Sequence, residues 1–333
     1  MKIAVDAMGG DRAPEEIVDG VVRAVADAGG DIDIVLAGKI SEIESCFDRG
    51  GYSRDHIDMV EAPEVVGMSE SPAAAFRKKK RSSIAVAIEK HRAGEADAIF
   101  SAGNTGATVA GSLLSLGRIP GISRPAIAIT YPTEGGDLVL LDGGANSDCY
   151  PHHLLQFASM GAIYAEFFLG KENPRVGLLN IGEEKSKGNE LTRETYTLLA
   201  DSGLNFIGNV EGKDVFEGAA DVVVTDGFVG NTVLKFTESL IFYIMRILKE
   251  AAGSSVLSKA GLLFMKPALK KLKSKLDYAE YGAMPLLGIN GSVFIAHGGS
   301  SARAIRSGLL SISRYHGSGV NERIIRRMKG DPD

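Results

Sequence analysis

Five apolar runs of the sequence end in glycine together with aspartate, asparagine, serine or threonine. They read IAVDAMGGD (3–11), AIFSAGNTGA (98–107), VLLDGGAN (139–146), GLLNIGEEKSKGNE (177–190) and VVVTDGFVGN (222–231). Glycine lets a ligand approach the backbone closely, and a helix N-terminus offers free N–H donors and the positive end of the helix dipole. One such loop is usually an ordinary strand-to-helix turn, but five together favour a phosphate-binding site.

Cationic and acid–base side chains near these loops could assist such an anion. Lys185, Lys187 and Lys235 could pair with phosphate or with a phosphodiester, although a solvated surface lysine is the commoner case. His297, in FIAHGGSS, could donate to an oxyanion or act as an acid and base. A single histidine at a strand end is more often structural, so both roles stay open for it.

Several familiar chemistries lack their sequence signals. The chain has neither G-x-x-x-x-G-K-[ST] nor G-x-G-x-x-G after its first strand, and it has no G-x-S-x-G. Nucleotide, hydride and serine-hydrolase chemistry are therefore disfavoured. Cys149 lies beside two histidines in NSDCYPHH, so a Cys–His acyl-enzyme is an alternative, but adjacency in sequence does not establish the required geometry.

Acidic side chains recur at the ends of the same runs, and two roles are open for them. They could hold a divalent cation, because hard cations prefer oxygen ligands, or they could cap helices and orient lysine and asparagine side chains. The sequence has no recognised metal-ligand spacing, so we expect neither a metal nor another cofactor. The residues concerned are Asp6, Asp11, Asp142, Glu183, Glu184 and Asp226.

The composition limits where the chain works. It has 333 residues, of which 44% are hydrophobic and 24% are charged, and its formal net charge is -5. This is ordinary for a globular protein and unlike a general binder of polyanions. Cys46 and Cys149 form no disulfide framework, and the apolar runs are too short for a signal peptide or a membrane span. We expect a cytoplasmic protein that binds no nucleic acid.

A regular scaffold must hold the glycine-bordered runs in place. Short apolar runs predict strands over 2–6, 32–36, 57–61, 96–100, 126–130, 138–141, 175–180, 205–207 and 221–225. Longer segments predict helices over 14–27, 41–48, 72–93, 105–116, 151–168, 189–200 and 231–251. This alternation is typical of an α/β protein with a mostly parallel sheet sandwiched by helices, whose strand ends share one edge. No linker divides residues 1–333, which are predicted to form a single catalytic unit, with two lobes as the alternative.

An ordered set of motifs makes the sequence resemble a known family. DAMGGD, SAGNTGA, LLDGGAN, LLNIGEE-x₃-GNE, FIGNVEG, VVVTDGFVGN-x₃-K and AHGGS occur in this order over residues 1–315. Together they are similar to the motifs of the acyl-carrier-protein:phosphate acyltransferases. The resemblance implies an isocitrate/isopropylmalate-dehydrogenase-like fold, shared with phosphotransacetylases, and a homodimer. It also implies that long-chain acyl-[acyl-carrier-protein] and inorganic phosphate give an acyl phosphate, which a membrane glycerol-3-phosphate acyltransferase consumes in bacterial phospholipid synthesis.

Such a reaction sets what the site residues must do, because phosphate is itself the nucleophile. The protein must hold the anion in line with the thioester carbonyl and stabilise the developing oxyanion. The predicted phosphate-binding residues are Asp6, Gly9, Gly10, Asp11, Ser101, Gly103, Asn104, Thr105, Gly106, Asp142, Gly143, Asn146, Asp226 and Gly227. The predicted catalytic residues, which polarise or orient the reactants, are Asn180, Lys185, Asn209, Asn231, Lys235 and His297.

Residues 231–291 depart from the alternation and are predicted to form a helical excursion. Residues 251–276 contain no acidic residue, and apolar side chains recur there at spacings of three and four. Such a basic amphipathic helix could contact a dimer partner, an anionic membrane surface or the acidic carrier protein. The residues in contact would be Lys259, Lys266, Leu269, Lys270, Lys271 and Lys273. A second basic run, RKKKR (77–81), is another candidate for the carrier-protein contact.

Two other kinds of function stay open at this point. A related scaffold could carry a coenzyme A-dependent phosphotransacetylase or a decarboxylating dehydrogenase. Alternatively, the chain could be a non-catalytic peripheral membrane scaffold for lipid synthesis. The density of glycine and asparagine in the loops argues against a purely structural role, because a scaffold needs no phosphate-sized pocket.

Overall fold

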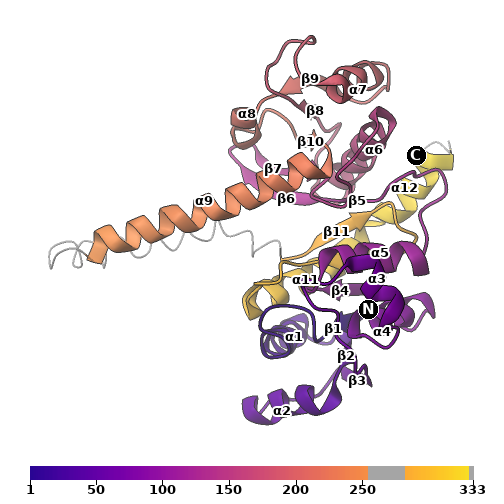
Figure 1. Ribbon diagram of the computed structural model, residues 1–333, viewed down its shortest axis with the longest axis vertical. Helices are drawn as coiled ribbons and strands as arrows, with labels where there is room; N and C mark the ends of the chain where they lie inside the picture. Colours follow the sequence, from indigo (N-terminus) through magenta and orange to yellow (C-terminus); the bar gives the residue numbers. More distant parts are fainter. Residues whose placement is uncertain (254–281, 330–333) are drawn as a thin grey trace.

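The computed structural model describes residues 1–253 and 282–329, whose strands form two separate sheets (Figure 1). In Figure 1 one sheet lies with its helices below the other, and the long helix α9 (Gly227–Gly253) projects away from both. The fold class predicted from the sequence, an α/β protein with mostly parallel strands and flanking helices, is confirmed. That residues 1–333 act as one catalytic unit stays a prediction.

The first sheet consists of β1 (Lys2–Asp6), β2 (Asp33–Gly38), β3 (Ile57–Glu61), β4 (Ala98–Ser101), β5 (Ala126–Ile127), β11 (Met284–Leu287) and β12 (Val293–Ile295). Its strand order is β3-β2-β1-β4-β12-β11-β5, and the strands from β3 to β12 are parallel. β11 is antiparallel to both of its neighbours. Ile3 and Val5 face one hydrophobic core and Ala4 faces another, so β1 is buried on both sides, which explains its continuous apolar run.

The second sheet consists of β6 (Ile129–Thr133), β7 (Gly136–Leu141), β8 (Val176–Leu179), β9 (Phe206–Val210) and β10 (Val222–Val224). Its strand order is β6-β7-β10-β8-β9, and only the β6–β7 hairpin is antiparallel. Val222 and Val224 face one core while Val223 faces the other. Within each sheet, the carboxyl ends of the parallel strands therefore share an edge, as ligand-binding α/β sheets require.

Helices cover the faces of both sheets (Figure 1). Those of the first sheet are α1 (Glu15–Ala28), α2 (Ile40–Gly50), α3 (Pro72–Lys78), α4 (Ser83–Arg92), α5 (Thr105–Ser115) and α11 (Ala302–Ser318). Those near the second sheet are α6 (Pro151–Phe167), α7 (Glu190–Ala200), α8 (Gly212–Glu217), α9 and α12 (Val320–Lys329). The side chains of Asn104, Asn189 and Ser301 accept backbone N–H groups and so begin α5, α7 and α11.

The structure divides two elements that the sequence predicts as continuous. The predicted strand 126–130 is two strands in different sheets, because the Ala128 N–H donates to the Pro285 carbonyl while Ile129 already pairs with Leu140. The predicted helix 72–93 is interrupted between α3 and α4. Lys79 leaves the helix there, and its Nζ donates to the Val65 carbonyl and to Glu70.

The predicted helical excursion 231–291 needs a correction. It is helical up to Gly253, but residues 284–287 form strand β11, which lies between β12 and β5 and is buried from residue 285 to 287. The predicted contact residues Lys259, Lys266, Leu269, Lys270, Lys271 and Lys273 lie outside the described residues. Their role stays a prediction.

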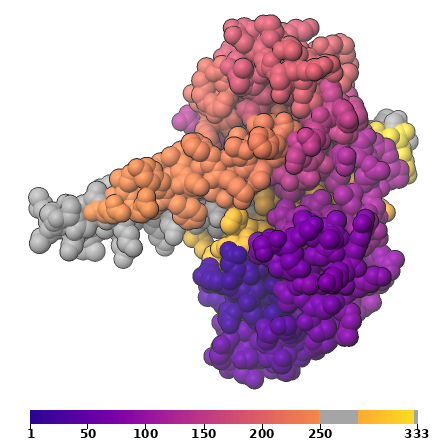
Figure 2. Space-filling model, in the orientation of Figure 1, coloured from indigo at the N-terminus to yellow at the C-terminus, as the bar shows by residue number. Residues whose placement is uncertain are grey.

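Helix α9, orange in Figure 2, begins against the body of the molecule, and its far end projects away from it. Its 27 residues correspond to a length of about 40 Å. Large apolar side chains are exposed along it, among them Phe236 at 69% and Phe242 at 64%. In the described part of the chain, no helix combines the length and the apolar character needed to cross a membrane.

Candidate active site

A buried carboxylate organises the loops that follow β1 and β4. Asp6 is 3% exposed, and its Oδ2 accepts a hydrogen bond of 2.7 Å from the Ser101 hydroxyl. The Ser101 oxygen in turn accepts the Gly103 N–H at 3.1 Å. Burial raises the pKa of Asp6, and hydrogen bonds such as that from Ser101 act in the opposite direction. Three predicted site residues from two loops therefore lie together around this carboxyl group.

Glycine at position 9 is required by the close approach of these loops. A Cβ on Gly9 would lie 2.8 Å from the backbone nitrogen of Gly103, in the loop after β4, and 2.4 Å from the Asp6 Oδ2. Gly10 follows with φ +129°, a conformation that side chains disfavour. The Asp11 N–H then donates to the Gly298 carbonyl at 2.8 Å, in the loop after β12. The loops after β1, β4 and β12 thus form one glycine-lined edge of the first sheet.

Asn104 holds the start of α5 in place. Its Oδ1 accepts the Ala107 N–H at 3.0 Å as a helix cap. Its Nδ2 donates to the carbonyls of three residues in an earlier loop, namely Gly67, Met68 and Glu70. Because these bonds occupy both side-chain atoms, the structure gives Asn104 a positioning role for Thr105 and Gly106, the first residues of the helix.

A second buried carboxylate organises the loop after β7. Asp142 is fully buried, and its Oδ1 accepts the N–H groups of Ile127, Gly144 and Ala145, each at 3.0 Å. Its Oδ2 accepts the backbone N–H and the side-chain amide of Asn146 at 2.7 and 2.8 Å. Burial raises the pKa of Asp142, and the five donors oppose that shift. Donors on all sides indicate that the group is held as a carboxylate.

The loop after β7 meets the start of α9. The Gly227 N–H donates to the Asn146 carbonyl at 2.8 Å, and the Asp226 Oδ1 caps the first turn by accepting a backbone N–H. A Cβ on Gly144 would lie 3.1 Å from the Cβ of Asn231. The second sheet therefore gathers the predicted residues Asp142, Gly143, Asn146, Asp226, Gly227 and Asn231.

Two asparagines at the ends of β8 and β9 hold the loop that carries Lys185. The amide nitrogens of Asn180 and Asn209 both donate to backbone carbonyls of this loop. Asn209 is 7% exposed, and its Oδ1 has no hydrogen-bond partner. The Lys185 Nζ lies 5.4 Å from the Tyr196 ring centroid, and no described carboxylate forms an ion pair with it.

His297 connects the first sheet to α9. Its Nδ1 accepts the Gly299 N–H at 3.0 Å, so the neutral ring carries its proton on Nε2. That Nε2 lies 3.8 Å from Glu238 Oε2, which is beyond direct hydrogen-bond distance. Glu238 lies on the same face of α9 as Lys235 and Asn231, three and seven residues earlier. The strand ends of the two sheets therefore approach each other at this helix.

A narrow cavity of about 40 Å³ lies beside His297. It is lined by residues of β6, α9, α11 and the loop after β12, so both sheets contribute to it. Thr130, Glu238 and Ser300 provide polar groups on its wall. The cavity has room for a few water-sized groups only.

The expectation that the glycine-bordered strands share one edge is wrong. The loops after β1 and β4 belong to the first sheet, whereas those after β7, β8 and β10 belong to the second. The same kind of buried apolar run serves both sheets, so the sequence does not distinguish them. Sequence reasoning also missed Glu238, although its helical spacing from Lys235 and Asn231 is a signal that could have found it.

Cys149 does not have the surroundings of a nucleophile. Its thiol donates to the Asn146 carbonyl at 3.7 Å, and burial raises the pKa of the thiol to about 12. The neighbouring His153 Nδ1 accepts the Tyr150 N–H at 3.1 Å and so is not available as a base for the thiol. The geometry therefore disfavours a Cys–His acyl-enzyme.

Three acidic residues at the strand ends accept hydrogen bonds from the protein's own loops. Within residues 1–253 and 282–329, no three His, Cys, Asp or Glu side chains are grouped as a metal ion would need. Asp6, Asp142 and Asp226 accept N–H or hydroxyl donors instead. Capping and loop orientation, the second role considered for the acidic residues, is the one seen for these three.

The fold is that of known phosphotransacetylases. A phosphotransacetylase from Streptococcus pyogenes superposes with a TM-score of 0.62 at 19% identity, covering 95% of this chain and 94% of that one. The EutD phosphotransacetylase from Staphylococcus aureus gives 0.59 at 16% identity, covering 96% and 94%. The chain is therefore an α/β protein with the fold seen in these phosphotransacetylases, and its glycine-lined strand ends lie at the carboxyl edges of the two sheets.

Sequence comparison assigns the family. A family described as "Fatty acid synthesis protein" matches residues 1–323. A phosphate acyltransferase of Desulfitobacterium hafniense is 52% identical over 325 residues, covering 97% of this chain and 96% of the relative. One of Geobacter sulfurreducens is 48% identical over 329 residues, covering 99% and 94%. The chain belongs to the phosphate acyltransferase family and is an acyltransferase of fatty acid synthesis.

Proposed function

We propose that this chain transfers a long acyl group from acyl-[acyl-carrier-protein] to inorganic phosphate and releases an acyl phosphate for phosphatidic acid synthesis. The product would be consumed by a membrane glycerol-3-phosphate acyltransferase. Full-length similarity to phosphate acyltransferases supports the use of phosphate as acceptor. The carrier protein as donor rests on the ordered motifs of the sequence.

The observation that carries the proposal is a set of unpaired cations beside rigid glycine loops. The carboxylate oxygens of Asp6 and Asp142 accept hydrogen bonds from loop N–H and hydroxyl groups. These two carboxylates therefore fix the loops and form no ion pair with a described lysine. In the described part of the chain, Lys185 and Lys235 have no ion-pair partner. A preorganised loop next to an unpaired ammonium group stabilises an anion with little reorganisation.

The proposed reaction needs no enzyme nucleophile. An oxygen of the phosphate dianion attacks the thioester carbonyl, and a C–O bond forms as the carbonyl oxygen becomes negative. The C–S bond then breaks, and the carrier thiolate leaves and takes up a proton. The thiol of Cys149, whose pKa is raised to about 12, is not required at any step.

Two side chains are suited to orient the reactants in this scheme. The neutral His297 ring can donate its Nε2 proton to the developing oxyanion, because its Nδ1 is already occupied by a backbone N–H. The Asn209 amide donates to the Glu184 carbonyl, so it can orient the loop that carries Lys185, whose ammonium group would pair with phosphate.

The test is product formation from defined donors. The chain is incubated with palmitoyl-[acyl-carrier-protein] and labelled phosphate, and acyl phosphate is trapped as the hydroxamate with hydroxylamine. Parallel reactions contain palmitoyl-coenzyme A, acetyl-coenzyme A or a nicotinamide cofactor. The proposal predicts that the carrier-protein thioester is the preferred donor. Faster turnover of a coenzyme A ester would establish the phosphotransacetylase alternative instead.

Helix α9 supports the proposed homodimer. Phe236, Leu240, Tyr243 and Ile247 are exposed and recur at spacings of three and four, so they form an apolar stripe on the projecting helix. A stripe of this kind is typical of a helix that packs against another helix. A second copy of the chain is the occupant we propose. Peripheral association with an anionic membrane is proposed for the basic residues beyond Gly253, and vesicle co-sedimentation of wild type and Leu269→Glu tests it.

A further inference from the structure

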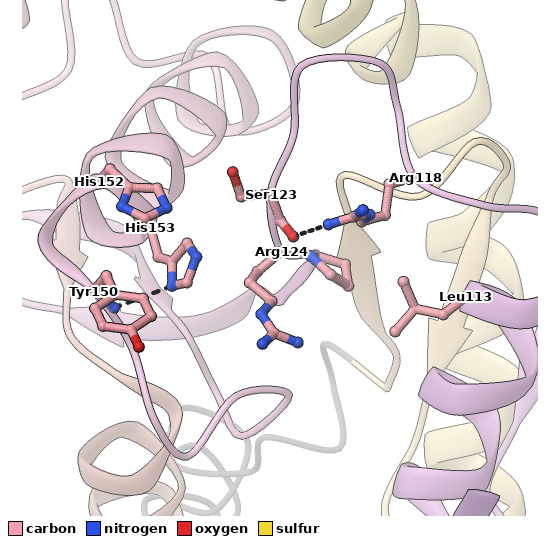
Figure 3. A pocket seen from close by; sticks show the side chains of 8 residues that line it. Leu113, Arg118, Ser123, Arg124, Tyr150, His152 and His153 are labelled. Atoms are coloured by element: carbon pink, nitrogen blue, oxygen red, sulfur yellow. Dashed lines mark hydrogen bonds between the residues drawn. The ribbon is translucent and has the colours of Figure 1, made fainter.

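A second pocket lies on the border between the two sheets, where the loop from α5 to β5 meets the start of α6 (Figure 3). Its volume is about 510 Å³. None of its eight lining residues carries a carboxylate, whereas two are arginines and two are histidines. This size is in the range of about 300–1,000 Å³ that small organic ligands occupy. The pocket therefore combines room for an organic molecule with an excess of positive charge.

The two arginines of the pocket lack carboxylate partners. Arg118 donates to the backbone carbonyl of Ser123, which leaves most of its guanidinium donors free. Arg124 makes no hydrogen bond or ion pair with any residue of 1–253 or 282–329. Both side chains are exposed. Guanidinium groups in this state are well suited to bind a phosphate group, because their planar donors match its oxygens.

Three aromatic rings form the opposite wall. The Tyr150 and His152 rings are stacked, with centroids 5.9 Å apart, and the His153 ring lies 4.1 Å from that of His152. His153 is 5% exposed, and its Nδ1 accepts the Tyr150 N–H, so the neutral ring carries its proton on Nε2. In the view of Figure 3, Arg124 lies between these rings and Arg118.

The electrostatic surroundings of His153 report the same excess of positive charge. Burial lowers its pKa, and the positive charges of His152 and Arg124 lower it further. No described carboxylate raises it. A bound anion would act in the opposite direction and raise the pKa of His153.

We propose that this pocket binds a phosphate ester, with the phosphoryl oxygens on Arg118 and Arg124 and the organic part against Tyr150, Leu113 and Pro125. The inference rests on the proposed function for the choice of ester, which is the phosphodiester of the carrier protein's pantetheine arm. The pocket also adjoins the candidate active site. Its wall residue Pro125 accepts a hydrogen bond of 2.7 Å from Asn146, in the loop that Asp142 organises.

Calorimetric titration of the full chain tests the pocket without requiring turnover. The ligands are 4′-phosphopantetheine and pantetheine, which differ only in the phosphate group. We expect wild type to prefer the phosphorylated ligand by at least about tenfold, as one charge-assisted contact would give. Arg124→Ala should remove about tenfold of this preference, and Arg124→Lys should restore part of it. Arg326→Ala, an exposed arginine on α12, is the matched control and should change nothing.

The outcomes separate this inference from the proposed function. Equal affinity of wild type for the two ligands, or an undiminished preference in Arg124→Ala, would overturn the inference. Inorganic phosphate that binds as tightly as phosphopantetheine, and loses affinity in Arg124→Ala, would assign the pocket to the free ion and also overturn it. A retained preference in a protein that forms no acyl phosphate would remove the proposed function and leave the pocket assignment intact.

Discussion

The substitution Asp142→Asn probes how much one buried carboxylate contributes to the order of the candidate site. In the wild-type protein, Oδ1 accepts three N–H groups and Oδ2 accepts two, both from Asn146. An asparagine side chain keeps one oxygen. It will turn that oxygen toward the three donors, so its amide nitrogen faces the two N–H groups of Asn146 and both hydrogen bonds are lost.

The cost follows from these two bonds. Hydrogen bonds to a charged group contribute about 1.5–3 kcal/mol each, so two of them amount to about 3–6 kcal/mol. The substitution also removes a buried charge, and the desolvation that it no longer requires offsets part of this loss. We therefore expect the free energy of unfolding to fall by about 3 kcal/mol, a large fraction of the usual 5–15 kcal/mol.

Urea denaturation followed by circular dichroism measures this change. The midpoint should fall while the slope with denaturant stays constant. Asp226→Asn is the matched control, because Asp226 is only partly buried and caps α9 with a single hydrogen bond of 2.8 Å. It should cost less than about 1 kcal/mol, because asparagine caps a helix nearly as well as aspartate and only the attraction between the charge and the helix dipole is lost. If Asp142→Asn were no more destabilising than this control, the role given to the buried carboxylate would be refuted.

Three further predictions follow from other parts of the chain. Although burial raises the pKa of Asp221, its hydrogen bonds from Arg175 outweigh this and lower the pKa below the usual value. The resulting stabilisation is present above the unfolded-state pKa of about 3.9 and is lost as the pH falls through the folded-state value. Asp221→Asn should therefore cost about 1 kcal/mol at pH 7 and little at pH 3, and equal losses in urea titrations at both pH values would contradict this. Lys185→Ala should lower acyl phosphate formation by at least about tenfold with an unchanged urea midpoint, because the side chain is exposed; full turnover would exclude it from the site. Phe236→Glu should reduce the mass found by light scattering from two chains to one, whereas Phe216→Glu on α8, also exposed, should leave it unchanged; a dimer of Phe236→Glu would rule out the α9 contact.

The sequence predicts some individual strands well, whether they are buried like β1 or largely accessible like β3. The predicted strands 2–6 and 57–61 have the bounds of β1 and β3. Prediction of strands from the sequence fails where the chain passes from one sheet to the other. All five residues of 126–130 are buried, so no periodicity marks the point at which Ala128 leaves one ladder and Ile129 joins the other. The interruption of helix 72–93 likewise depends on tertiary contacts of Lys79, which the helix propensity of the local sequence does not predict.

For the candidate site, glycine and carboxylate positions are the predictable part. Their chemistry is local, since a carboxylate followed by glycine organises its own loop, as Asp6 and Asp142 both do. The meeting of His297 with Glu238 depends on how α9 packs against the first sheet, and no short-range pattern encodes it. The pocket around Arg124 was missed for the same reason, because it joins two loops that belong to different sheets.

The direct passage of the chain from β5 to β6 has a structural consequence. Only Ala128 separates the two strands, and its own N–H is tied to the Pro285 carbonyl. So short a crossing holds the edge strands β5 and β6 next to each other, and residues of both sheets share the same hydrophobic cores. The loop that carries His297 and strand β6 therefore form walls of one cavity, although they belong to different sheets.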